Sequence, residues 1–232
     1  GWIDEVPRAG AGDAGASGYI AVMSLAGLPP SFIKPTALIL NILVACLSSW
    51  HFYRAGHFRW ALFWPFAVLA IPMAFLGGYI NLPVHIFKII VGIVLLFSAI
   101  HFLIGQKEDG ESRKTSLGTS LAVGGSFGFL AGLTGTGGGI FLTPVLILMR
   151  WAPTKTASAT SAVFILANSA SGLTGNIAST KHLPPLVIPL AVAVICGGAI
   201  GSYMGSHKFA PVVIKRFLAL VLTIAGAKLI FT

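Results

Sequence analysis

The sequence predicts an all-α, polytopic membrane protein made of two repeats of inverted topology, with broken or short helices at its glycine-rich motifs. Hydrophobic residues make up 56% of the 232 positions, charged residues make up 9%, and the mean hydropathy is +0.90. A soluble domain of this size does not have such a composition. The apolar runs 84–104 and 211–231 approach the roughly 20 residues that a helix needs to cross the bilayer core. The alternating segments of a transmembrane barrel are absent from the sequence.

The distribution of charge excludes several functions. The formal net charge is +9, but the 15 Lys and Arg residues are scattered singly between hydrophobic segments, which is typical of membrane topology and not of a nucleic-acid-binding face. Residues 112–232 contain no acid at all, so the second half has no carboxylates for hydrolysis or for a hard-metal site. Cys46 and Cys196 have no metal-ligand spacing around them. We therefore predict no metal, no cofactor, no nucleic-acid partner and no enzymatic activity.

A single hydrophilic stretch, QKEDGESRKT at residues 106–115, divides the chain into two apolar halves. We expect 1–105 to be the first repeat, 106–115 a cytoplasmic linker and 116–232 the second repeat, all within one transmembrane domain. Four landmarks recur at a displacement of 124 to 127 positions, which favours duplication. They are Thr36 and Ser161, His57 and His182, residues 74–79 and 198–203, and Lys88 and Lys215.

The elements of the second half follow from its apolar runs and breakers. We expect a helix over about 115–133, the glycine cluster, a short apolar segment at 140–149, and helices that begin near Thr160, Pro185 and Pro211. The first half has only a short stub before its glycine-rich stretch GAGDAGASG, so an opening helix is expected to be missing from it.

Loop charges indicate how the repeats sit in the membrane. Arg54 and Arg59 mark one loop of the first half, whereas the equivalent loop of the second half has only Lys181. The next loop, near Asn81, has no Lys or Arg, but its counterpart has Lys208. The bias inverts between the halves, which under the positive-inside rule predicts inverted repeats with the linker on the cytoplasmic side.

The stretch GTGGGIFLTP, residues 135–144, has four glycines in its first five positions. Each glycine costs about 1 kcal/mol relative to alanine in a helix, so we expect the helix to break here. Breaks within the bilayer are tolerated where protein or a water-filled cavity satisfies the backbone, and the first amides of a restarting helix suit an anion. The alternative is close helix packing, and it fits Gly124, Gly128 and Gly132, which are spaced by four.

The candidate substrate ligands lie in and after the glycine stretches. Thr160 and Ser161 supply hydroxyl groups in the first turns of the next helix, although Thr160 is also suited to be an N-cap. Asp13 lies within the first glycine stretch and is either a proton-coupling carboxylate or a helix cap. Lys34, Arg150 and Lys155 either draw anions inward or extend to the lipid headgroups. The full predicted set of substrate-binding residues is Gly135, Gly137, Gly138, Gly139, Thr160, Ser161, Asn168, Gly15, Gly18, Thr36 and Asn41.

The segments GLTGTGGGIFLTPVLIL and ATSAVFILANSASG resemble the second-half signature of the sulfite exporter TauE/SafE family. The segment AGLPPSFIKPTALILNILVACLSSWHFYRAGHFRW resembles its first-half pattern, so the resemblance extends from about residue 12 to 230. It implies a polytopic bacterial-type transporter of small sulfur-containing anions, such as sulfite or organosulfonates. It places the family's glycine signature on Gly135 and 137–139, its proline on Pro144 and its Thr-Ser pair on residues 160–161. The first glycine cluster is diluted here, and Thr36-Ala37 replaces a Thr-Ser or Thr-Asn pair, which implies a weaker or differently tuned ligand shell.

We therefore expect a multi-pass protein of the inner (cytoplasmic) membrane that exports small anions by alternating access, with the anion and the lipid bilayer as its partners. A passive anion channel is the nearest alternative, because a broken-helix site serves a pore equally well. A rhomboid-like serine protease is a distant one, since Gly15-Ala16-Ser17-Gly18 matches its GxSG motif. The sequence leaves open the transported anion, the direction of transport, proton or sodium coupling, and whether two copies form a homodimer.

Overall fold

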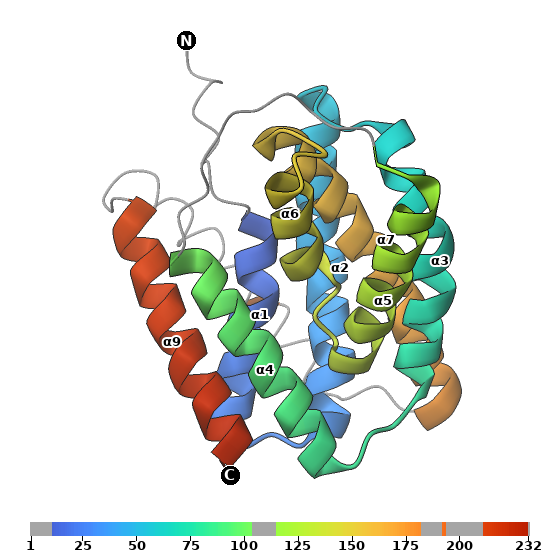
Figure 1. Ribbon diagram of the computed structural model, residues 1–232. Coiled ribbons are helices and arrows are strands. Elements are labelled where there is room, and N and C mark those ends of the chain that lie inside the picture. The colour runs from blue at the N-terminus through green and yellow to red at the C-terminus, as the bar shows by residue number, and fades with distance from the viewer. Residues whose placement is uncertain (1–10, 104–114, 182–191, 194–210, 232) are drawn as a thin grey trace.

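The computed structural model describes residues 11–103, 115–181, 192–193 and 211–231 of the chain. All secondary structure within these residues is helical, which confirms the all-α prediction (Figure 1). The helices are α1 (Ala11–Leu25), α2 (Pro30–Arg54), α3 (Trp60–Tyr79), α4 (Val84–Leu103), α5 (Leu117–Thr134), α6 (Gly139–Leu148), α7 (Thr154–Thr180) and α9 (Pro211–Phe231).

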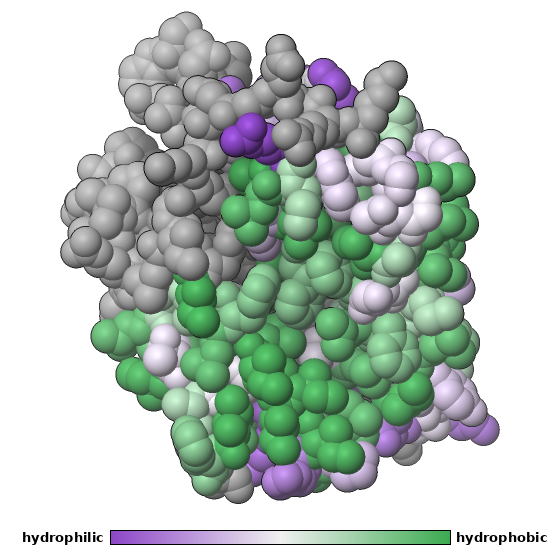
Figure 2. Space-filling view, viewed as in Figure 1, coloured by the Kyte–Doolittle hydropathy of each residue, from purple (hydrophilic) through white to green (hydrophobic). Residues whose placement is uncertain are grey.

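The surface has the hydropathy of a protein that lies in a bilayer. Three of the described helices, α2, α3 and α5, are long and apolar enough to cross a membrane. Large apolar side chains face outward, among them Val68 at 57% exposure, Ile93 at 57% and Ile224 at 53%. Figure 2 shows a hydrophobic band across the molecule with hydrophilic residues gathered at its upper and lower ends. Lipid, unlike water, tolerates such a surface, so the chain is a helical membrane protein.

Helices from the two halves of the chain lie side by side. Helix α3 packs against α5 and α7, α2 packs against α7, and α4 pairs with α9. In Figure 1, α2 and α7 run in opposite directions, and so do α4 and α9. Helices α2 and α7 also begin alike, because Pro29 and Pro153 are their N-caps with extended backbones, ψ 153° and 155°.

Helix α5 reaches α3 through its small residues. A Cβ atom at Gly124, Gly128 or Gly132 would lie 2.2, 2.3 or 2.1 Å from a carbonyl oxygen of α3, closer than any side chain can come. The backbones of α3 and α5 are therefore in direct contact along this face, as in membrane helices that pack through residues spaced by four. This confirms the packing role expected for these three glycines.

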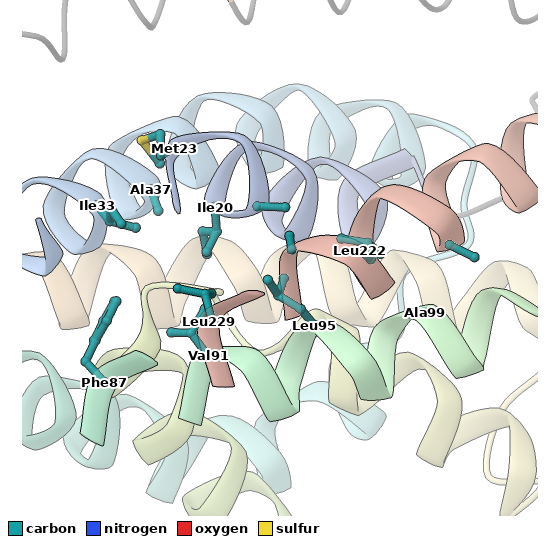
Figure 3. Packing of buried hydrophobic residues seen from close by; sticks show 13 residues of the cluster. Ile20, Met23, Ile33, Ala37, Phe87, Val91, Leu95, Ala99, Leu222 and Leu229 are labelled. Atoms are coloured by element: carbon teal, nitrogen blue, oxygen red, sulfur yellow. The ribbon is translucent and has the colours of Figure 1, made fainter. Parts of the chain in front are cut away.

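Two hydrophobic clusters hold the bundle together. The first joins α1, α2, α4 and α9, and its members include Ile20, Val91 and Leu222 (Figure 3). The second joins α3, α6 and α7 and includes Phe66 and Leu142.

The expected bounds are confirmed for most of the second half. Helix α5, the short helix α6 and the start of α9 at Pro211 agree with the prediction, but α7 begins at Thr154 and not near Thr160. The cause is Pro153, which suits the helix start and places the residues up to Thr160 in the first two turns. The helix expected near Pro185 and the repeat landmarks His182 and 198–203 lie outside the described residues. The division into two repeats and a linker stays a prediction.

Candidate functional site: a buried polar cluster at a helix break

The glycine cluster breaks the helix as the sequence predicts. Helix α5 ends at Thr134, and Gly135 follows in the left-handed region with φ 80° while its amide donates to the Ala131 carbonyl at 2.9 Å. Gly137 and Gly138 also have positive φ values, 73° and 83°. Only glycine adopts such angles without strain, which explains the residue type at these positions. In Figure 1 the chain turns back here, so α5 and α6 form a hairpin.

The break leaves backbone amides without backbone acceptors in a buried place. The amides of Phe141 and Leu142 donate to the Gly138 carbonyl, each at 3.2 Å, but those of Gly139 and Ile140 have no backbone acceptor among the described residues. Gly138 is the N-cap of α6 and has no side chain to cap them. Residues 131–144 are all buried. The α6 N-terminus thus presents unpaired amides, with the partial positive charge of the helix dipole, inside the protein.

Two side chains from the first half of the chain hold the break in place. The Asn41 amide nitrogen Nδ2 donates to the Gly135 carbonyl at 2.8 Å, and the Tyr19 hydroxyl donates to Asn41 Oδ1. Asn41 is 1% exposed. The structure therefore brings the predicted residues Asn41 and Gly135 together. Tyr19 was missed, although its place directly after Gly18 was visible in the sequence.

Helix α7 carries a row of buried, unpartnered polar groups, and one of them, Ser169, lies at this break. Ser161, Asn168 and Ser169 are 1%, 0% and 0% exposed, and both hydroxyl oxygens and both polar atoms of the Asn168 amide have no hydrogen-bond partner. Their spacing of seven and eight residues places them on one helical face. A Cβ atom on Gly137 would lie 2.9 Å from Ser169 Oγ and 3.2 Å from Asn41 Nδ2, so Ser169 and Asn41 lie at the break. Ser169 was also missed, because a serine beside Asn168 carries no distinctive pattern.

The two predicted threonines lie within helices and not at their starts. Thr160 Oγ1 donates to the Thr156 carbonyl at 2.8 Å, one turn back in α7, so the N-cap interpretation is wrong. The physical reason is the earlier start of α7 after Pro153. Thr36 has the matching place in the second turn of α2 and is 1% exposed.

The first glycine stretch does not break the helix. Helix α1 is continuous from Ala11 to Leu25, so the predicted sites Gly15 and Gly18 lie inside a helix, and the expectation of a second break there is wrong. Alanines alternate with these glycines and sustain the helix, whereas three glycines are consecutive at 137–139. Asp13 lies in the first turn of α1, but its side chain is outside the described residues, so proton coupling stays a prediction.

Lys34 has a different role from either one expected. It is 5% exposed, and its Nζ donates to the carbonyl oxygens of Gly77 at 2.9 Å, Gly78 at 2.8 Å and Ile80 at 2.8 Å. The ammonium group therefore caps the end of α3, where the negative end of the helix dipole favours a cation. Among the described residues it is the one buried charge, and its backbone also packs on the break, since a Cβ on Gly135 would meet its carbonyl at 3.0 Å.

Comparison with known proteins places these features in a family. Residues 9–229 match the family described as Sulfite exporter TauE/SafE. A "Probable membrane transporter protein y4hK" of Sinorhizobium fredii is 37% identical over 96% of this chain and 92% of its own length. The "Probable membrane transporter protein MJ0441" of Methanocaldococcus jannaschii is 24% identical over 86% of this chain and 80% of its own. No solved structure matches the chain significantly.

Proposed function

Because the chain belongs to the sulfite exporter TauE/SafE family of membrane transporters, we propose that it exports small sulfur-containing anions, of the sulfite or organosulfonate type, across the inner membrane. The proposed substrate site is the break between α5 and α6 together with the facing surface of α7. The observation that carries the proposal is the set of buried, unpartnered polar side chains on α7, whose Ser169 hydroxyl lies against Gly137 of the break.

The chemistry of this cluster favours an anion. Its free groups are mainly donors: the amides of Gly139 and Ile140, the Asn168 Nδ2 group and the hydroxyls of Ser161 and Ser169. A buried polar group without a partner costs about 1–3 kcal/mol, and an oxyanion with several acceptor oxygens relieves several of these costs at once. Residues 112–232 contain no acid to repel it. Compact sulfur oxyanions fit both requirements.

The arrangement of the helices supports a carrier built from inverted repeats. Helices α2 and α7 run antiparallel and share proline N-caps, and α4 and α9 also run antiparallel (Figure 1). Inverted repeats that meet at a central site are the architecture of many alternating-access carriers. The site also joins the halves directly, through the bond from Asn41 to the Gly135 carbonyl. We therefore prefer alternating access to a passive anion channel.

Transport assays with the purified protein in liposomes test the proposal. Vesicles are loaded with radiolabelled sulfite, and efflux is compared in the presence of unlabelled sulfite, an organosulfonate, sulfate and a neutral sulfone outside. We expect saturable flux and accelerated exchange with sulfite or the organosulfonate, and no effect of the sulfone. Flux that does not saturate and follows the electrochemical gradient alone identifies a channel. If none of the anions crosses the membrane faster than in liposomes without the protein, the proposed function is wrong.

A further inference from the structure

A cavity with a mainly apolar wall lies away from the helix break, where α1 and α9 end and α2 and α4 begin. Its volume is about 260 Å³, and its wall includes Ser24, Lys88 and Lys228 beside apolar side chains such as Phe87 and Leu229. Figure 1 shows these helix ends at the side of the bundle opposite the α2–α3 and α6–α7 loops. None of the residues proposed for the transported anion lines it.

The polar groups of this cavity are arranged to receive a ligand. The Ser24 hydroxyl oxygen is buried and has no hydrogen-bond partner, although a serine inside a helix commonly bonds to the carbonyl one turn back. Lys228 is exposed, and its Nζ donates to the Leu25 carbonyl at 3.0 Å, which leaves two of its three N–H donors for a ligand or solvent. Lys88 is half-buried and supplies the second positive charge. The lining residues include no acid.

The position and size of the cavity favour a lipid headgroup. Helices α4 and α9 lie at the edge of the bundle and expose apolar side chains, such as Ile86 at 45% and Ile224 at 53%, so the cavity adjoins a lipid-facing surface. Its volume is below the roughly 300 Å³ at which pockets for drug-sized ligands begin, which suits one phosphate and its first neighbouring groups. Two lysines in a wall without acids complement the negative charge of a phospholipid phosphate.

We propose that this cavity binds the phosphate group of an anionic phospholipid, with Lys88 and Lys228 as its charge partners and the Ser24 hydroxyl as a hydrogen-bond donor. The acyl chains then lie along the apolar surfaces of α4 and α9. The site is separate from the substrate site, so the bound lipid stabilises this face of the bundle and is not transported.

Thermal unfolding of the purified full chain in detergent, with added lipid, tests the proposal. We expect phosphatidylglycerol to raise the unfolding midpoint more than phosphatidylcholine with the same acyl chains, because a ligand of the folded state stabilises it by mass action. The variants Lys88→Gln and Lys228→Gln should each weaken the phosphatidylglycerol effect, with an apparent affinity about fivefold lower per lysine. Lys181→Gln, which removes an exposed lysine at the end of α7, is the matched control and should leave the effect unchanged.

Ser24→Ala keeps the test decisive if the lysine variants fold poorly. It removes a buried hydroxyl that has no partner, so the lipid-free protein should be no less stable, while the stabilisation by phosphatidylglycerol should shrink. Equal stabilisation by the two lipids, or equal losses in Lys88→Gln and Lys181→Gln, would overturn the proposal. Inorganic phosphate or sulfite that reproduces the lysine-dependent effect without lipid would also overturn it, because the cavity would then be a site for free anions.

Discussion

Replacing Asn168 by leucine separates a substrate ligand from a structural residue. In the protein without substrate, the Asn168 amide is 0% exposed and neither of its polar atoms has a hydrogen-bond partner. Leucine has a similar volume and no polar atoms. The substitution therefore removes groups that destabilise the empty protein and that we propose to bind the anion.

The two effects have opposite signs and estimable sizes. Removal of unpartnered buried groups should raise the free energy of unfolding of the empty protein by about 1–3 kcal/mol. A hydrogen bond to a charged ligand contributes about 1.5–3 kcal/mol, and about 1.4 kcal/mol corresponds to a tenfold change in affinity. Loss of the bond from Asn168 Nδ2 should therefore lower sulfite affinity at least about tenfold. A residue that only supports the fold would instead lose stability and transport together.

The free energy of unfolding is measured by chemical unfolding in detergent. The affinity for sulfite is measured from the concentration dependence of sulfite efflux from liposomes. Asn176→Leu is the matched control, since Asn176 is on the same helix, is 3% exposed and has an unpartnered Oδ1, but lies two turns beyond Asn168. We expect it to leave efflux unchanged. The reasoning is refuted if Asn168→Leu keeps normal efflux. It is also refuted if the substitution lowers both the free energy of unfolding of the empty protein and the sulfite efflux.

Three further substitutions test other parts of the structure. Gly137→Ala should lower the free energy of unfolding by about 1–3 kcal/mol, because its φ of 73° strains alanine and its Cβ would lie 2.7 Å from a neighbouring side chain. The control Gly118→Ala, whose Cβ meets nothing within 4 Å, should be neutral or stabilising in the same unfolding assay. Gly128→Ala should destabilise the protein by about 1–3 kcal/mol by forcing α3 and α5 apart. Gly125→Ala should destabilise it less, because a flexible leucine side chain, and not backbone, faces that position. Equal losses of stability on thermal unfolding would contradict the packing argument. Lys34→Met should lower the free energy of unfolding by about 1.5–3 kcal/mol, since the three carbonyls that its ammonium group satisfies lose a charged donor. An unchanged midpoint of thermal unfolding would show that this cap does not stabilise the protein.

Local composition was enough to predict several parts of this protein. The length and apolarity of its runs indicated membrane helices, and the dense glycines at 137–139 indicated the break between α5 and α6. The spacing of Gly124, Gly128 and Gly132 indicated the close contact that α5 makes with α3. The same reasoning wrongly predicted a helix break at 10–18, because helix-forming alanines lie between the glycines there and keep the backbone helical.

The sequence by itself determined the class of protein and the place where a helix must stop, because hydropathy and backbone propensity are properties of neighbouring residues. Only the tertiary structure decided which side chains meet at that place. Asn41 reaches a carbonyl 94 positions away, Tyr19 supports it from another helix, and Lys34 is held by α3 instead of facing an anion. Such hydrogen bonds depend on how separate helices pack. The residues next to a polar side chain on an apolar helix do not reveal which group it will bond to.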